Sequence, residues 1–215
     1  LLGLGKIDEA IAELRQALGV AREPRALFAL CRAYEVTAKP IDALVAYDDA
    51  AKLDKTGVDV RVAAARLRIA RGAYREAIKG LQEAAKLDAK RADVHMMIGE
   101  CAVALRDRRA ALAAFEQASR QDPNNAEAHY KAGEQLHDSG KAREAISHLR
   151  RAVELLAPDQ KPEWVDDAYS LLGAAYRDTR QNGQSCEFYR KYLQVAPDAP
   201  DRDEVSQVMR LVCGG

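Results

Sequence analysis

Apolar and small side chains recur at helical spacing along almost the whole chain, and the pattern repeats every 34 residues. A shift of 34 brings blocks 24–57, 58–91 and 92–125 into register. A fourth block covers 126–159, and a fifth covers 166–199 after an insertion of about six residues. Self-similarity at such a period is typical of stacked repeat units, each of which buries its apolar face against its neighbours.

Four columns of this alignment hold side chains of one kind. Two columns hold alanine, a third holds a bulky residue four positions after the first alanine, and a fourth, early in each block, holds a small residue. In this order the columns are Ala43, Ala77, Ala111 and Ala145; Ala50, Ala84, Ala118 and Ala152; Tyr47, Leu81, Phe115, Leu149 and Tyr189; and Cys31, Ala65, Gly99, Gly133 and Gly173. Small side chains let two helices approach closely, and a bulky one fills the gap between them. Each block therefore predicts a pair of packed helices.

Turn residues divide the blocks where such a pair requires it. Gly72 and Gly140 lie between the two helical stretches of their blocks, and Pro123 and Pro197 follow a second stretch. Proline ends a helix because it lacks the backbone donor and clashes with the preceding turn.

With these columns the chain resembles the tetratricopeptide repeat over nearly its whole length, most closely in block 92–125, which carries Ile98-Gly99, Ala111, Phe115, Ala118 and Pro123. The resemblance implies an all-α fold, a right-handed superhelical α-solenoid of helix-turn-helix repeats. The chain departs from the family at the fourth position of each block, which is often aromatic in the family. That position holds Leu27, Arg61, His95, His129 and Tyr169. In the last block Ser185 and Tyr192 replace the two alanines.

We predict a single solenoid over residues 1–215, with about twelve helices in one stack. Residues 1–23 are interpreted as a partial repeat that contains a second helix, and the five blocks are complete repeats. Residues 200–213 are predicted to form a capping helix, since Val205, Val208, Met209 and Val212 lie at helical spacing. The chain begins with Leu1 in the middle of a motif, so we expect a fragment.

Balanced charge argues against one class of function. The 33 basic and 33 acidic residues give a net charge of zero, whereas a protein that neutralises nucleic-acid phosphates normally has a basic excess. No apolar run is long enough to span a membrane. We find no phosphate-binding glycine loop, no nucleophile motif, and no histidine pair at helical spacing with a third ligand. We therefore predict no catalytic residue, no metal site and no cofactor.

The four cysteines lack the spacing of a metal site, a redox motif or a disulfide framework. We interpret them as free, buried, reduced thiols, which favours a reducing compartment. A cytoplasmic location is therefore expected, with a periplasmic or lipid-anchored location left open because the true N-terminus is not seen.

The resemblance also implies where a partner binds, because the first helices of such repeats line a concave face. The predicted partner-binding residues are Phe28, Arg32, Val62, Arg66, Ile69, Met96, Met97, Glu100, Tyr130, Lys131 and Glu134. Their apolar members would form an exposed strip, or alternatively belong to the core. Arginines gather towards the N-terminal end of the set and glutamates towards the C-terminal end. Such a face suits an amphipathic or extended apolar segment with charged flanks.

Three further residues have two interpretations each. Arg61 and Arg68 either lay their stems along a helix pair with the guanidinium in water, or form a basic docking patch for an acidic partner. Trp164, in the insertion, is either a rim anchor for a partner or a packing residue.

Together these patterns predict a non-catalytic scaffold that binds a protein or peptide, not a nucleic acid. Arg outnumbers Lys two to one, which we interpret as a sign of a bacterial genome. The resemblance favours assembly or regulation of a multiprotein complex of the pilus, secretion or motility type. The alternatives are a lipid-anchored outer-membrane assembly factor of the pilotin type, a helical-repeat RNA binder, and a regulatory domain of a larger enzyme. Self-association at the uncapped N-terminal end is also expected.

Overall fold

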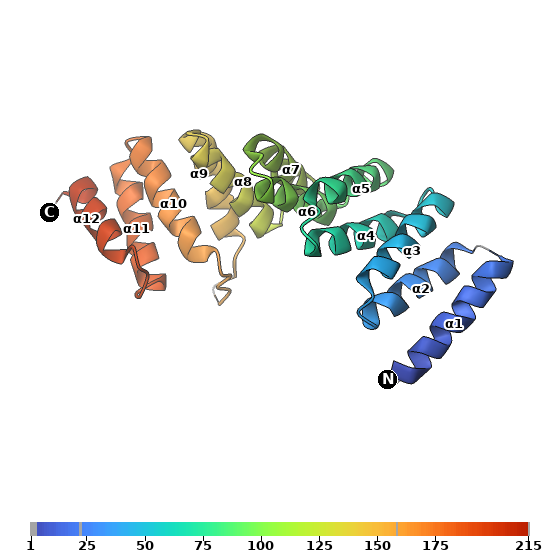
Figure 1. Cartoon of the computed structure of the whole chain (residues 1–215). Helices are drawn as coiled ribbons and strands as arrows, with labels where there is room; N and C mark the ends of the chain where they lie inside the picture. Colours follow the sequence, from blue (N-terminus) through green and yellow to red (C-terminus); the bar gives the residue numbers. More distant parts are fainter. Residues whose placement is uncertain (1–3, 22, 158, 215) are drawn as a thin grey trace. The chain divides into compact units, whose positions relative to one another are not determined.

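The computed structural model describes residues 4–21, 23–157 and 159–214, and within these residues it contains twelve α-helices and no strand (Figure 1). The helices are α1 (Leu4–Val20), α2 (Pro24–Val36), α3 (Pro40–Leu53), α4 (Val58–Ala70), α5 (Tyr74–Leu87), α6 (Ala92–Ala104), α7 (Arg108–Gln121), α8 (Ala126–Asp138), α9 (Ala142–Glu154), α10 (Val165–Asp178), α11 (Asn182–Val195) and α12 (Arg202–Cys213). The all-α prediction is confirmed. None of the described helices is long and apolar enough to cross a membrane.

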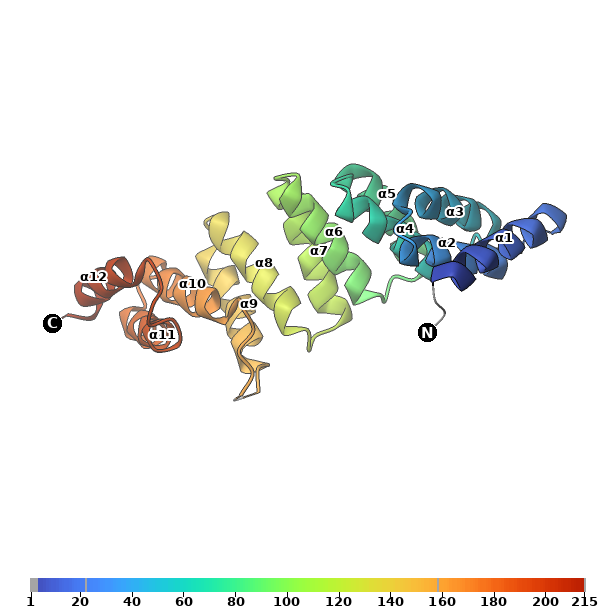
Figure 2. The same ribbon diagram turned by 60° about the horizontal axis from the view of Figure 1, so that its bottom comes forward.

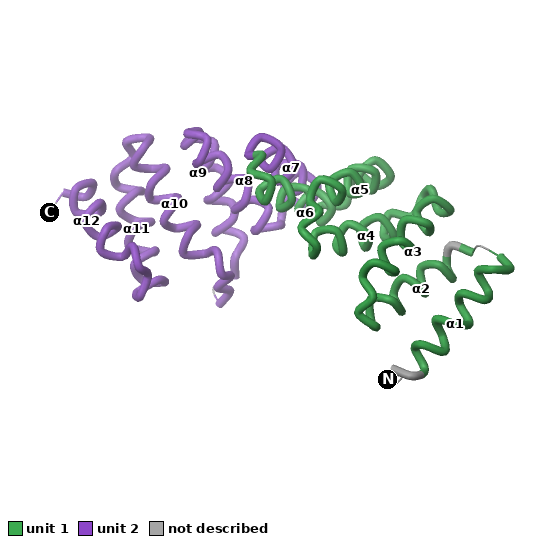
Figure 3. Tube along the Cα trace, viewed as in Figure 1, with its two compact units in different colours: residues 1–107 green, residues 108–215 purple. Residues whose placement is uncertain are grey.

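The chain divides into two compact units, Leu1–Asp107 and Arg108–Gly215 (Figure 3). Unit 1 holds α1 to α6 and unit 2 holds α7 to α12. Within each unit every helix packs against the next one in sequence, as the two ribbon views show (Figures 1 and 2). The single solenoid over 1–215 and its repeat boundaries stay predictions. Of the predicted repeats, positions 1–3, 22 and 158 lie outside the described residues.

The small-residue and bulky columns of the sequence meet directly in unit 2. A Cβ placed on Gly133 of α8 would lie 2.6 Å from Leu149 Cγ of α9. A Cβ on Gly173 of α10 would lie 2.5 Å from Tyr189 Cδ1 of α11. Both distances are far below van der Waals contact, so only glycine allows these helices their spacing. The packing role predicted for the two columns is thus borne out.

The two departures in the last block have clear structural reasons. Ser185 is fully buried where earlier blocks have alanine, and its Oγ donates a 2.7 Å hydrogen bond to the Gly173 carbonyl. This bond satisfies a polar group that would otherwise be costly to bury. Tyr192 fills the other alanine position and donates its hydroxyl hydrogen bond to Asp201, at the start of α12.

The turn inside each helix pair has one backbone geometry. Gly72 and Gly140 have φ of 73° and 74°, and Ala38, Arg106 and Arg180 take φ of 53°, 59° and 60° at the equivalent positions. In each turn the next residue donates to a carbonyl five positions back, as is typical of a helix C-terminus closed by a left-handed residue. The sequence indicates the two glycine turns, whereas the other three carry side chains that this conformation disfavours.

Helix α12 covers the last helix pair, as the capping prediction requires. Its Val205 is buried against Tyr189 and Tyr192, with Val208 and Met209 packed around them.

One expectation about the cysteines is wrong. Cys186 of α11 and Cys213 of α12 form a disulfide with their Cα atoms 5.8 Å apart, whereas Cys31 and Cys101 are free and buried as expected. The pairing leaves no spacing signature because the two residues come from different helices, 27 positions apart.

Candidate partner-binding surfaces

In unit 1, the helices α2, α4 and α6 present a row of charged side chains to solvent. Arg32, Arg66 and Glu100, at the ninth position of their blocks, are all exposed. The apolar residues Phe28, Ile69 and Met97 on the same helices are partly exposed. This surface combines accessible charge with accessible apolar area, as a peptide-binding face requires.

Three of the predicted partner-binding residues do not lie on an open surface. Val62 and Met96 are 5% and 8% exposed, so the expectation of an exposed strip is wrong for these two residues. Tyr130 is also buried, at 2% exposed. Val62 packs in the core cluster of α4 to α6, and Tyr130 packs in the core cluster of α8 to α11. The fifth position of these blocks thus points into the helix stack. Partner binding by the predicted set stays a prediction.

Phe28 also lines a pocket of about 570 Å³ at the edge of unit 1. Its wall contains the apolar side chains of Val58 and Val60, and the inter-repeat turns contribute carboxylates. The charged lining residues are Arg25, Asp54, Asp59, Asp88 and Arg91. The Arg91 side chain is already engaged in two ion pairs: its Nη1 lies 2.9 Å from Asp59 Oδ1, and its Nε lies 2.8 Å from Asp93 Oδ1.

In unit 2, the corresponding surface carries a ring stack. Trp164, which directly precedes α10, stacks on Tyr130 of α8 with ring centroids 4.8 Å apart and planes 10° apart. Trp164 is therefore a packing residue that holds α8 and α10 together. Lys131 lies 5.1 Å above the Tyr130 ring and 3.9 Å from Glu134, and both side chains are half-buried.

Carboxylates surround this stack. Partial burial, and then the charges of Asp166 and Asp201, raise the pKa of Asp167, whereas Lys131 lowers it. Burial and the neighbouring Glu134 also raise the pKa of the Tyr130 hydroxyl. Negative charge is therefore in excess here, and a cation brought by a partner would relieve it.

Arg61 and Arg68 prove to be structural. Arg61 donates to the carbonyls of Ala51, Asp54 and Gly57 at 3.1, 3.1 and 2.7 Å. It thereby satisfies acceptors at the C-terminal end of α3 and at the residue that precedes α4. Arg68 Nη2 lies 2.6 and 2.8 Å from the two carboxylate oxygens of Asp48. Neither guanidinium lies free in water, and neither is available as a docking patch.

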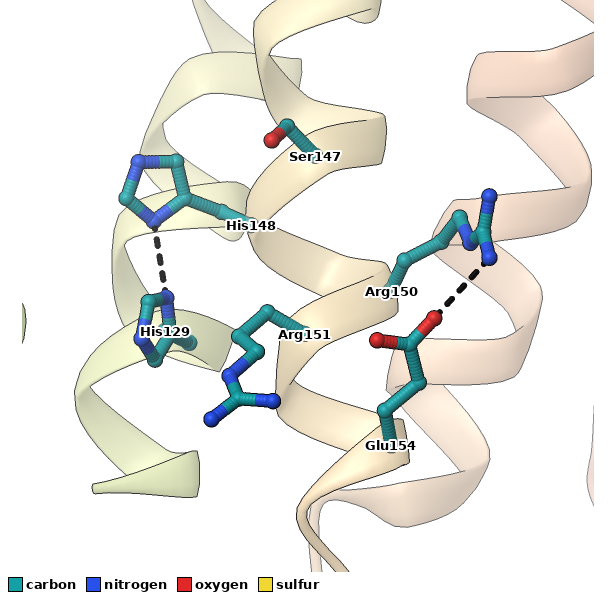
Figure 4. A pocket seen from close by; sticks show the side chains of 6 residues that line it. All are labelled: His129, Ser147, His148, Arg150, Arg151 and Glu154. Carbon is teal, nitrogen blue, oxygen red and sulfur yellow. Dashed lines mark hydrogen bonds and ion pairs between the residues drawn. The ribbon is translucent and has the colours of Figure 1, made fainter. Parts of the chain in front are cut away.

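A third surface, between α8 and α9, was not indicated by the sequence analysis. His129, Ser147, His148, Arg150, Arg151 and Glu154 line a pocket of about 430 Å³ (Figure 4). The Nδ1 atoms of His129 and His148 lie 3.3 Å apart, and Arg150 pairs with Glu154 at 2.9 Å. Burial is the largest cause that lowers the pKa of both imidazoles. The signal that could have found this pair is that positions 4 and 23 of each block face one another.

The thiols of unit 1 are poorly suited to chemistry. Burial raises the pKa of Cys31 to about 12 and that of Cys101 to about 11, so neither is a reactive thiolate at neutral pH. Over the part of the chain that the structure describes, no group of three or more His, Cys, Asp or Glu side chains could hold a metal ion.

Comparison with known proteins agrees with this architecture. Tetratricopeptide-repeat profiles match residues 102–161 and 166–199. Among solved structures, the chain is similar to YrrB, described as a TPR protein with an unusual peptide-binding site. Its TM-score is 0.74 at 20% identity, over 90% of this chain and 97% of that chain. A MamA structure has a TM-score of 0.68 at 19% identity, over 81% and 92% of the two chains. PilF of Pseudomonas aeruginosa has a TM-score of 0.66 at 17% identity, over 94% and 90%. No curated protein sequence matches the chain.

Stacked helix pairs with buried small-residue columns define a helical-repeat scaffold, a fold that is in general non-catalytic and serves protein–protein interaction. Its particular class is indicated by the repeat profiles and the similar structures: residues 102–161 and 166–199 match tetratricopeptide-repeat profiles, and the fold is that of a tetratricopeptide-repeat solenoid.

Proposed function

We propose that this protein is a non-catalytic scaffold that binds a partner segment along the first helices of its repeats. The observation that supports this most is the exposure of Arg32, Arg66 and Glu100 on α2, α4 and α6, beside the accessible edges of Phe28 and Met97. Charged side chains around accessible apolar area give both affinity and orientation to a bound segment. The similar protein YrrB is described as having a peptide-binding site, which is consistent with the proposal.

The charges of each unit favour a particular chemistry in the partner. In unit 1 the exposed Arg32 and Arg66 favour a segment with carboxylates beside its apolar residues. In unit 2 the carboxylates around Asp167 favour a lysine or arginine. A segment of this kind is amphipathic or extended, with charged flanks.

Charge reversal in unit 1 tests the proposal. The wild-type chain and the Arg32→Glu/Arg66→Glu variant are immobilised, and proteins captured from the source cell extract are crosslinked and quantified. We expect the variant to capture at least tenfold less of a specific set of proteins than the wild type does. The association of these proteins with the wild type should weaken as the salt concentration rises. Arg71→Glu, an exposed arginine in the turn after α4, is the matched control and should capture the same set as the wild type. Equal capture by all three proteins would contradict the proposal.

We propose assembly or regulation of a multiprotein complex as the setting. The expected cytoplasmic location stays a prediction, and the Cys186–Cys213 disulfide weighs against it because disulfides persist mainly in oxidising compartments.

A further inference from the structure

His129 and His148 occupy two repeat positions that hold other pairs of residues in the other helix pairs. The same two positions hold Arg61 and Gly80 in the second block, His95 and Ala114 in the third, and Tyr169 and Phe188 in the fifth. The fifth pair packs as two aromatic rings with centroids 6.3 Å apart. The fold therefore does not require histidine at either position, and two histidines facing one another need another explanation.

The separation of the two facing ring nitrogens matches that of two ligands on one ion. A metal about 2.0–2.1 Å from each of two imidazole nitrogens, at a tetrahedral angle, holds those nitrogens about 3.3 Å apart. The Nδ1 atoms of His129 and His148 are 3.3 Å apart, and they come from two helices, α8 and α9, that are packed together. We propose that His129 and His148 form a binding site for a divalent transition-metal ion, with water at its remaining positions.

The surroundings of His129 support ligation through Nδ1. Its Nε2 atom is buried and has no hydrogen-bond partner among the described residues, whereas its Nδ1 atom faces Nδ1 of His148. Nδ1 is therefore the ring nitrogen of His129 that can share a ligand with His148. A neutral imidazole binds a metal through either ring nitrogen, so Nδ1 can serve as the ligand.

The pocket can accommodate a cation and its water ligands. Its volume of about 430 Å³ is open to solvent, and Ser147 adds an oxygen on the wall (Figure 4). The charges that influence the two imidazoles are those of two arginines and three carboxylates. They belong to Arg120, Arg151, Glu116, Asp122 and Glu144. Arg151 is held by Asn124 at 3.2 Å. The site is therefore not closed to a divalent ion by net positive charge.

Zn²⁺ is the probe, titrated calorimetrically into the full chain at neutral pH. The double variant His129→Tyr/His148→Phe carries the ring pair that Tyr169 and Phe188 already form, so the helix pair keeps a packing that this chain tolerates. We expect one Zn²⁺ per chain on the wild type, and at least tenfold weaker binding by the double variant. Each single substitution should weaken Zn²⁺ binding nearly as much as the double variant does, because both histidines bind the same ion.

His95→Gln is the matched control, since His95 occupies the same position as His129 in the preceding block. It should bind Zn²⁺ as the wild type does. Circular dichroism confirms that each variant is folded before titration. Unchanged Zn²⁺ affinity in the folded double variant would overturn the proposal by placing the ion elsewhere. Absence of wild-type binding at millimolar Zn²⁺ would also overturn it, and would leave the two imidazoles as a hydrogen-bonded pair.

Discussion

At the scale of single residues, the closest contacts between helices depend on glycine facing a bulky side chain. At Gly133 an added Cβ would meet Leu149 both at its Cγ and at its backbone nitrogen, 2.6 and 3.2 Å away. A rotamer change of Leu149 cannot relieve the backbone contact, so α8 and α9 would have to move apart.

Gly133→Ala should therefore lower the free energy of unfolding by about 1–3 kcal/mol. Gly183→Ala is the matched control, because Gly183 also lies in a helix but has nothing within 4 Å of the point that a Cβ would occupy. That substitution should be neutral, or stabilising by up to about 1 kcal/mol through helix propensity. Urea denaturation of both variants measures the difference, and equal midpoints would show that the predicted contact does not limit the helix spacing.

In the turns inside the helix pairs, two substitutions should change the stability in opposite directions. Arg180 is exposed and takes φ of 60°, a conformation that glycine adopts without strain. Arg180→Gly should thus raise the stability by about 0.5–1 kcal/mol, and Gly140→Ala, at φ of 74°, should lower it by about 1 kcal/mol. Thermal melts of the two variants should move in opposite directions. A loss of stability in both would mean that Arg180 has a packing role that outweighs its backbone strain.

Residue periodicity predicts burial better than it predicts which polar groups meet. The alanine and bulky columns follow from the 34-residue repeat, because a buried position repeats with the fold. The prediction of an exposed strip is wrong at Val62 and Met96, which are buried. A shift of one residue along a helix turns a side chain from the groove towards the core, and the repeat alignment does not resolve so small a shift. Arg61 satisfies carbonyls of the preceding helix, and a partner of this kind leaves no trace in spacing.

At the scale of helices, the capping role of α12 could be predicted from its apolar stripe, but its covalent link to α11 could not. The stripe is a local property of 200–213, whereas the disulfide depends on how two helices face each other. The pairing of Cys186 with Cys213 is a tertiary contact, so the spacing of cysteines along the chain does not predict it.

Reduction of this disulfide should destabilise the docked α12. Opening a loop of 27 residues restores chain entropy to the unfolded state, at a cost of about 3 kcal/mol of stability. Denaturation of the wild type with and without dithiothreitol measures the effect, read from the fluorescence of the chain. Cys186→Ser/Cys213→Ser should have the stability of the reduced protein and should not respond to dithiothreitol. A reductant effect of equal size in that variant would assign it to another cause.

At the scale of the whole molecule, the fold and the binding face rest on different grounds. The helical-repeat fold follows from the sequence period and agrees with the profile matches and the similar structures. The binding face is a proposal that rests on exposure and charge in each unit separately. The sequence could not separate groove from core at the fifth positions, and it could not identify a partner, because both depend on contacts that repeat columns do not encode.

The most direct test of the central claim is hydroxyl-radical footprinting of the full chain, with and without a partner captured as proposed above. Phe28, Ile69 and Met97 report on the first helices of unit 1, and Leu53 and Leu87, which are 41% and 43% exposed, report on its second helices. We expect the partner to protect the first three side chains severalfold and to leave both leucines unchanged. Protection of Leu53 and Leu87, with Phe28 and Met97 still fully reactive, would contradict the claim.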